Sequence, residues 1–549
     1  MKHPTKILFK ILSFVEESPL SFPLWITTFL TLIFTRLFIE NWLGNFEYRD
    51  PQFLFNEFTH TFLFFLLSYL LFLPLLHYFS RTSIKASANI LLWGFLIILT
   101  PPLIDNIISG GGGFWSFYEF DGLQGLLVRF FTFFGENPEI GITYGVRIEV
   151  ALSILLFFSY ILLKTKDLLR SFFAAFLSYV LFFVLGTFPS WITIFFLGWT
   201  QGFFSIRDTD IAGLFLSPLS TQSYTPMAIM NALNAKMSLM YILILVLYIF
   251  LLSFFYYKKT TLALLRNARP VQIIYHGGLV CLGGALALLF SPQSVSYPTL
   301  FNISSFFILL IASLFAWFSS VIVNDLFDQK TDALTNTDRP LITKALTLQN
   351  YQIFGIVFFF SSLLLVTIAY PYLLFLFLIY FSLTWIYNAP PLRIKRLPFL
   401  ATFVSALASL TLLFSGYFAI DKTASLEHLP WEIIALLLFT YTVSLPLKDF
   451  KDIQGDKKND TWTLPVLLGE YNARLLIASG VFFSFLLSVL VFNIYSLVPW
   501  ALFFGGISFW TIAFSSIPFQ KKPLSARHLP AIILFLVFLY GLILTSQIL

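Results

Sequence analysis

Two series of aspartates in the second half of the chain have the residue type and the spacing of a cation site. In each series three residues stand at positions i, i+3 and i+7. They are Asp325, Asp328 and Asp332 in the first series and Asp449, Asp452 and Asp456 in the second, which Asp460 follows. On a helix this spacing places three carboxylates on one face. Three carboxylates that face the same way repel one another unless a cation compensates their charge.

The sequence therefore predicts sites for divalent cations, and cations held there would in turn hold a diphosphate. Mg²⁺ prefers hard oxygen ligands and typically shares them with substrate phosphates. Polar residues accompany both series, with Asn324 and Arg339 near the first and Lys448 directly before the second. A solvated acidic loop is the plainer interpretation of either series alone, and the matching spacing of the two series favours the cation sites.

A third polar loop offers positive charge for the same purpose. It follows an apolar segment and contains Tyr387, the paired prolines Pro390 and Pro391, and then Arg393 and Lys395. The prolines end the preceding helix and force an extended turn. The guanidinium and ammonium groups that follow can reach phosphate oxygens. The alternative is a basic loop that only sets membrane topology.

Composition places these loops in a membrane protein. Apolar residues make up 58% of the 549 residues, charged residues make up 11%, and Phe occurs 70 times. A soluble domain has about 25% charged residues, so we expect an integral membrane protein. The net charge of +6 does not indicate a nucleic-acid partner, because the basic residues lie at the ends of apolar segments. The single cysteine, Cys281, excludes an intramolecular disulfide and a cysteine-based metal site.

The predicted fold class is an all-α, polytopic membrane protein, because segments of about 20 apolar residues recur and each can cross a bilayer as a helix. About six are expected in the first half, near 23–42, 60–80, 87–108, 146–164, 170–199 and 237–257. About nine are expected in the second half, near 271–290, 301–323, 351–369, 371–387, 399–419, 431–447, 473–493, 497–517 and 529–547. Pro189 predicts a kink or a break in the fifth.

The basic residues also predict an orientation in the membrane. Counted span by span, the lysine and arginine clusters fall on one side, which the positive-inside rule assigns to the cytoplasm. The N-terminus and the three polar loops, 324–350, 388–398 and 448–472, are therefore predicted to be cytoplasmic. The long loops on the opposite side are nearly free of lysine, although they carry three arginines, Arg49, Arg129 and Arg207.

From about residue 266 to 549 the chain resembles the UbiA superfamily of intramembrane prenyltransferases. Four motifs stand in the order of that family. The Arg-Pro that opens the first helix is Arg269-Pro270, and the motif Asn-Asp-x-x-Asp-x-x-x-Asp runs from Asn324 to Asp332, with Arg339-Pro340 after it. The loop Tyr-x-x-Pro-Pro-x-Arg-x-Lys runs from Tyr387 to Lys395, and the second acidic motif runs from Lys448 to Asp456.

The resemblance implies Mg²⁺-dependent transfer of a polyprenyl group from its diphosphate to a lipid or aromatic acceptor within the membrane, with Mn²⁺ as an alternative metal. The metal ligands that it implies are Asn324, Asp325, Asp328, Asp449, Asp452 and Asp456, with Asp332 as a further catalytic residue. The diphosphate-binding residues that it implies are Arg269, Arg339, Tyr387, Arg393, Lys395 and Lys448. The partners would be the polyprenyl diphosphate, the acceptor and membrane lipids. Neither the acceptor, nor the prenyl chain length, nor the oligomeric state follows from the sequence.

Two other functions stay open at this point. One is a terpene cyclase of the same fold, in which the allylic cation closes on its own chain. The other is a lipid-binding or transport protein that kept the fold without the chemistry. Intact aspartate series argue against the second, because a non-catalytic protein has no need of so many unpaired carboxylates. A cyclase would form its product without an acceptor.

The basic linker at 258–270 predicts a boundary between two domains, 1–265 and 266–549. The first domain resembles no family on its motifs, and its function is unknown. We expect it to be a separate helical domain that is dispensable for the core chemistry and that delivers acceptor or handles product. Arg147 and Glu149 stand at the start of one of its spans, where ionisable residues are costly. The plainer interpretation of these two residues is an interfacial pair near the outer surface.

Overall fold

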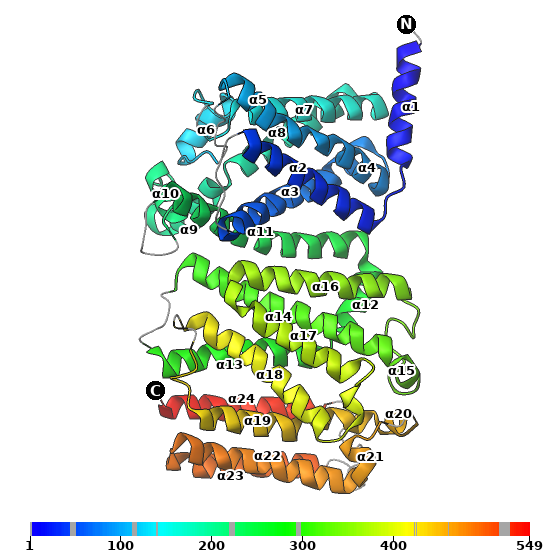
Figure 1. Ribbon diagram of the computed structural model, residues 1–549, viewed down its shortest axis with the longest axis vertical. Coiled ribbons are helices and arrows are strands. Elements are labelled where there is room, and N and C mark those ends of the chain that lie inside the picture. The colour runs from blue at the N-terminus through cyan, green and yellow to red at the C-terminus, as the bar shows by residue number, and fades with distance from the viewer. Residues whose placement is uncertain are drawn as a thin grey trace. The chain divides into compact units, whose positions relative to one another are not determined.

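The structure is a computed structural model of the chain (Figure 1). It describes residues 3–43, 51–111, 118–138, 141–218, 225–292, 298–421, 423, 425–458, 461–514 and 528–548. Asp460, which follows the second aspartate series, lies outside these residues. Within them the chain is built of α-helices and short 3₁₀ helices, with no β-strand. The predicted all-α fold class is confirmed.

The described residues contain 15 helices that are long and apolar enough to cross a membrane. Each corresponds to one of the spans expected from the sequence, and the chain is an integral membrane protein. These helices are 22–43, 51–80, 84–108, 144–165, 168–186 and 227–256 in the first half, and 270–290, 300–327, 348–369, 371–388, 400–420, 431–451, 470–492, 495–514 and 529–547 in the second.

The chain divides into two compact units, residues 1–245 and 246–549, with the division inside one long helix. Unit 1 contains α1 (His3–Glu17), α2 (Phe22–Leu43), α3 (Pro51–Ser80), α4 (Ile84–Gly94), η1 (Phe95–Leu99), α5 (Thr100–Ile108), α6 (Leu123–Phe131), α7 (Tyr144–Thr165), α8 (Leu168–Gly186), α9 (Phe188–Gln201), α10 (Asp208–Phe215) and most of α11 (Pro226–Tyr256). The predicted functional boundary at 265/266 stays a prediction.

Unit 2 contains the remaining helices. They are α12 (Lys258–Asn267), α13 (Pro270–Phe290), α14 (Leu300–Phe327), α15 (Gln329–Thr335), α16 (Leu348–Ala369), η3 (Pro371–Leu373), α17 (Leu374–Asn388), η4 (Ile394–Arg396), α18 (Leu400–Ile420), α19 (Trp431–Ser444), η5 (Leu445–Lys451), α20 (Ile453–Lys458), α21 (Leu464–Leu468), α22 (Glu470–Phe492), η6 (Tyr495–Leu497), α23 (Val498–Phe514) and α24 (Leu529–Ile548). Within each unit most of the long helices lie side by side (Figure 1).

Two features of unit 1 bear on the sequence predictions. The helix expected at 170–199 is broken, because α8 ends at Gly186 and α9 begins at Phe188 with Pro189 in its first turn, where a missing N–H is tolerated. The interfacial pair of Arg147 and Glu149 is not formed. Arg147 instead donates to the backbone carbonyls of Phe134, Gly135 and Ile142. Residues two apart on a helix do not face each other.

Close helix packing in unit 2 fixes the ends of the helices that carry the polar motifs. An added Cβ at Gly283 of α13 would lie 1.8 Å from the carbonyl oxygen of Leu413 on α18, so only glycine allows this approach. Helix α14 packs against α16, and Ser362 of α16 donates to the carbonyl of Ala312 on α14 at 2.8 Å. This pairing brings the C-terminal end of α14 beside the N-terminal end of α16.

Candidate functional site

Both aspartate series are interrupted at their middle residue. Helix α14 ends at Phe327 and α15 begins at Gln329, so that Asp328 stands between them with φ −106° and ψ 10°. In the second series η5 ends at Lys451 and α20 begins at Ile453, and Asp452 has φ −107° and ψ 4°. The expectation of one continuous helix face in each series is therefore wrong. Aspartate side chains compete for backbone groups and favour helix ends over helix interiors, and both series turn at this residue.

The two series meet where α15 packs against α20. Asn336, which follows α15, donates from Nδ2 to Asp332 Oδ1 at 3.0 Å and to Asp452 Oδ1 at 3.2 Å. Gly455 allows the approach, because an added Cβ there would lie 2.9 Å from the methyl groups of Thr331 and of Thr335. One amide thus joins a carboxylate of the first series to a carboxylate of the second.

Asp325 is the most enclosed of the six carboxylates, with 2% of its surface exposed. Its Oδ2 accepts from Asn267 Nδ2 at 2.8 Å and from the Tyr351 hydroxyl at 2.7 Å, and its Oδ1 accepts from Arg269 Nη2 at 3.2 Å. Asn267 in turn accepts from Arg339 Nη1 at 2.7 Å. This network joins the end of α12 and the start of α16 to the end of α14.

Asp328 is held by the basic loop. Arg393 Nη2 lies 2.8 Å from Asp328 Oδ1, and Lys395 Nζ lies 2.5 Å from Oδ2. Lys395 also donates to Asn324 Oδ1 at 3.2 Å. Arg393 and Lys395, which are predicted to bind phosphate, therefore contact Asp328 directly. Asp328 is itself predicted to bind the metal.

Lys448 has a different partner. Its Nζ donates to the Tyr387 hydroxyl at 3.0 Å and lies 5.0 Å from the centre of the Tyr387 ring. Both residues are predicted to bind the diphosphate, and the structure pairs them with each other. Neither side chain forms a hydrogen bond or an ion pair with Asp325 or Asp328.

The remaining carboxylates accept fewer hydrogen bonds. Asp332 Oδ2 is buried and has no hydrogen-bond partner among the described residues, and Asp449 has neither a hydrogen bond nor an ion pair among them. Asp456 accepts from the Thr463 hydroxyl at 3.3 Å. Burial, followed by the negative charge of Asp325, raises the pKa of Asp332 to about 6. Burial, followed by the charge of neighbouring aspartates, raises the pKa of Asp456 to about 7.

These oxygens fit a magnesium ion in donor chemistry. A carboxylate oxygen without a donor, with a pKa raised by other carboxylates, is stabilised by a nearby cation. Among the described residues no three His, Cys, Asp or Glu side chains converge closely enough to hold a metal by themselves. Mg²⁺ in phosphate-binding sites typically takes only one or two protein carboxylates and completes its shell with phosphate oxygens and water. The arrangement therefore suits a cation that is shared with a substrate diphosphate.

Three residues in these networks were not found from the sequence. They are Asn267, Asn336 and Tyr351. Single asparagines and tyrosines carry little signal in a chain of this composition, and each contacts a carboxylate through the tertiary fold. The one available clue was position, because Asn267 stands two residues before the Arg269-Pro270 motif.

Residues 278–539 match the model of the UbiA prenyltransferase family. These residues are a UbiA prenyltransferase family domain. No family model matches the N-terminal half. The match begins inside α13 and ends inside α24, so the UbiA domain includes the acidic series and the basic loop. Asn267 and Arg269, which hold Asp325, lie just before the matched residues.

Curated relatives match the UbiA domain at low identity. The digeranylgeranylglyceryl phosphate synthase of Pyrococcus horikoshii is 26% identical over 156 residues, which cover 28% of this chain and 53% of that protein. The 2-acylphloroglucinol 4-prenyltransferase of Humulus lupulus is 28% identical over 205 residues, covering 36% and 48%. The chain thus spans about half the length of these relatives. A solved UbiA homologue from Archaeoglobus fulgidus, bound to GPP and Mg²⁺, covers 51% of this chain and 96% of its own at 20% identity, with a TM-score of 0.40.

Proposed function

We propose that the UbiA domain transfers a prenyl group from a prenyl diphosphate to a lipid or aromatic acceptor within the membrane, with Mg²⁺ as cofactor. The observation that carries the proposal is the joint made by Asn336, which holds Asp332 and Asp452 together. It places two acidic segments, 116 residues apart between Asn336 and Asp452, at one place in a membrane protein. Family membership supports the reaction class.

The carboxylates divide into two groups by their contacts. Asp332, Asp449 and Asp456 have oxygens left for a cation, and they are the first candidates for metal binding. Asp452 joins them as a candidate, because its Oδ2 has only a long contact to Lys451 Nζ at 3.7 Å, while its Oδ1 accepts from Asn336. Asp325 is in the second group, because both of its oxygens already accept hydrogen bonds. Its Oδ1 has a single donor, the Arg269 guanidinium at 3.2 Å, and is therefore the oxygen of Asp325 proposed to bind a metal ion. Bound Mg²⁺ would stabilise the negative charge that develops on the departing diphosphate.

Arg393 and Lys395 bind the phosphate oxygens in this proposal. In the structure both cations are held by Asp328. A diphosphate beside Asp328 brings several oxygens of higher charge, and both side chains can pair with these oxygens while Asp328 is released. Charge-assisted contacts to phosphate are among the stronger hydrogen bonds in proteins. The ion pairs thus keep the loop in place until the substrate is bound.

Aromatic side chains next to Arg269 suit the allylic group. His276 and Trp317 stack with their ring centres 4.2 Å apart, and Trp317 Nε1 donates to the carbonyl of Ala268 at 3.2 Å. Tyr275 and Tyr380 lie close to the same pair. Aromatic faces stabilise a positive charge, and an apolar environment keeps water from the allylic cation.

The proposed acceptor is either a lipid or an aromatic compound. The relatives in P. horikoshii and H. lupulus are named for a glyceryl phosphate lipid and for an acylated phloroglucinol, which represent these two classes. Both acceptor classes therefore belong in the test. The loops 324–350, 388–398 and 448–472 and the N-terminus are proposed to be cytoplasmic, on the distribution of lysine and arginine.

The test uses the purified full chain with geranylgeranyl diphosphate and Mg²⁺, with and without geranylgeranylglyceryl phosphate or homogentisate. We expect acceptor-dependent release of diphosphate and a prenylated product in mass spectrometry. A hydrocarbon product formed without acceptor would indicate the cyclase. Tight binding of geranylgeranyl diphosphate without formation of inorganic diphosphate, with either acceptor class, would indicate the non-catalytic function.

Residues 1–265 are proposed to be dispensable for this chemistry and to deliver acceptor or handle product. The polar networks described above all lie in residues 267–463, which supports the division. The fragment 260–549 retains Asn267 and Arg269 and is expected to transfer the prenyl group to an acceptor used by the full chain. A folded fragment that binds Mg²⁺ and diphosphate without any transfer would contradict this role.

A further inference from the structure

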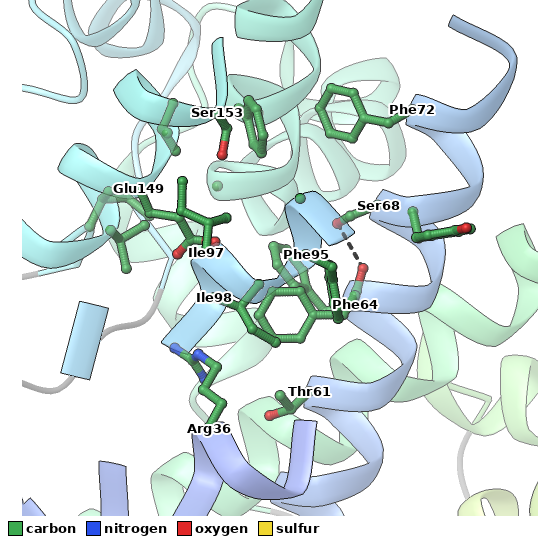
Figure 2. Close-up of a pocket in the computed structure, with 18 of the residues that line it drawn as sticks. Arg36, Thr61, Phe64, Ser68, Phe72, Phe95, Ile97, Ile98, Glu149 and Ser153 are labelled. Carbon is green, nitrogen blue, oxygen red and sulfur yellow. Dashed lines mark hydrogen bonds between the residues drawn. The ribbon is translucent and has the colours of Figure 1, made fainter. Parts of the chain in front are cut away.

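Unit 1 contains a cavity of about 320 Å³ between α2, α3, α4, η1, α7, α8 and α11 (Figure 2). This volume is within the range of about 300–1,000 Å³ that is usual for ligand pockets in proteins. None of the residues that line the cavity belongs to the aspartate site, so a ligand bound in it does not depend on the proposed prenyl transfer.

Most of the cavity wall is apolar, and much of it is aromatic. Phe64 and Phe72 of α3 and Phe95 of η1 face the interior in Figure 2, with Ile97 and Ile98 beside them. A wall of this kind selects an occupant with an apolar body. The aromatic faces can also stabilise a positive charge placed over them.

Glu149 is an acidic side chain of the cavity wall without a partner among the described residues. It lies in the second turn of α7, inside a membrane-spanning segment, and its carboxylate lines the cavity. Among the described residues it makes neither a hydrogen bond nor an ion pair. Arg147, its neighbour on α7, is bound to backbone carbonyls instead. Ser153 stands one turn further on the same face, and Thr61 lies across the cavity (Figure 2).

The arginine that lines the cavity already has partners. Arg36 of α2 lies 2.8 Å from Glu40 and over the ring of Phe65 at 5.4 Å. Besides this arginine the lining contains the glutamates Glu40, Glu57 and Glu149, and of these Glu149 has no hydrogen bond or ion pair among the described residues. The carboxylate of Glu149 would repel an anionic ligand such as a diphosphate. A cationic ligand would instead form an ion pair with this carboxylate.

We propose that this cavity binds an amphiphilic organic cation, with an ammonium group at Glu149 and an apolar body among the phenylalanines. An unpartnered carboxylate in a membrane-spanning helix is costly, and such groups usually face a partner or a pathway. A bound ammonium group supplies the missing partner and gains further stabilisation from the aromatic wall. Unit 1 thus takes a ligand of opposite charge to the diphosphate proposed for unit 2.

The test is photoaffinity labelling of the full chain in lipid nanodiscs with a decylamine that carries a diazirine in its alkyl chain. The matched probes are decanol and decanoic acid with the same diazirine. We expect the amine to label peptides of α3 and α7 at least about tenfold more than either matched probe, because a buried charge pair is worth more than a tenfold affinity difference. Equal labelling by the alcohol or stronger labelling by the acid, in the unaltered protein, would overturn the proposal.

Substitutions at Glu149 test whether its carboxylate causes the preference for the amine probe. Glu149→Gln should abolish the preference for the amine while the decanol probe still labels α3 and α7, which shows that the cavity is intact. Glu149→Asp keeps the charge and should keep the preference. Glu136→Gln makes the same change at an exposed glutamate outside the cavity and should have no effect. An amine preference that survives Glu149→Gln would overturn the assignment.

The lipid of the nanodisc distinguishes two sources of the cation. In phosphatidylglycerol no lipid carries an ammonium group, and the amine probe should reach the cavity freely. Phosphatidylethanolamine offers an ammonium head, and a severalfold loss there of the amine labelling that depends on Glu149, measured against Glu149→Gln in the same lipid, would identify a lipid headgroup as the natural occupant. Unchanged labelling would identify a free amphiphilic cation.

Discussion

Gly455→Ala tests whether the joint between the two aspartate series is needed for activity. The added Cβ would lie 2.9 Å from the Cγ2 atoms of Thr331 and Thr335. Carbon atoms that are not bonded normally approach to about 3.5–4.0 Å. Both methyl groups belong to β-branched side chains that are restricted at χ1, so α20 has to move away from α15. Asp452 and Asp456 flank Gly455 and would move with it.

The magnitude follows from the cost of overpacking. An extra carbon in a tightly packed interface costs about 1–3 kcal/mol. If this cost is met by separating the two series, the transition state loses a comparable stabilisation, and the rate of prenyl transfer falls about 5- to 150-fold. The assay is the initial rate of the purified full chain with geranylgeranyl diphosphate, the acceptor that it uses and saturating Mg²⁺.

Two further variants make the result specific. Gly506→Ala is the matched control, because Gly506 lies in α23 and an added Cβ there meets nothing within 4 Å. Replacing both threonines by serine in the Gly455→Ala protein removes the two methyl groups, and activity should recover by most of the loss. Wild-type activity in Gly455→Ala, or a folded triple variant that recovers nothing, would refute the reasoning.

Three other predictions concern the same site. Asp452→Asn should lower turnover at least about a hundredfold, on the order of 3 kcal/mol of transition-state stabilisation, and turnover close to that of the wild type would speak against its role. A chelator should abolish transfer and added Mg²⁺ should restore it, so full activity in excess chelator would exclude the metal. With Cys281→Ala as background, cysteines introduced at 344, 392 and 458 should react with an impermeant maleimide only from the cytoplasmic side, and reaction of any of them from outside would contradict the proposed orientation.

The spans could be predicted because their cause is local. A helix that crosses a bilayer needs about 20 consecutive apolar residues whatever its neighbours are, and 15 such segments were visible in the sequence and are present in the described structure. The break near Pro189 was visible for a similar reason, since the ring lacks an N–H and fixes φ. The four motifs likewise identified the family, because each is a short run of fixed residue types.

The partners of the motif residues could not be predicted in this way. Asp325 is held by Asn267 and Tyr351, residues 58 and 26 positions away from it. Asp328, expected to bind a metal, is held by the two cations that were expected to bind phosphate. Such contacts depend on which helix ends come together when the helices pack. The spacing of residues along the chain does not specify that packing.

The sequence by itself determined the membrane-spanning helices, the family of the second half and the residue types of its polar loops, because apolar length and short motifs are local properties. Only the tertiary structure decided how these residues are used. The carboxylate spacing suggested continuous helix faces, but the fold breaks each helix at Asp328 and Asp452 and joins the broken ends through Asn336. In unit 1 the sequence placed Arg147 beside Glu149, but the helix turns their side chains apart and leaves the glutamate facing a cavity. Side-chain direction and helix packing are set by the whole fold, and they decide which charges meet.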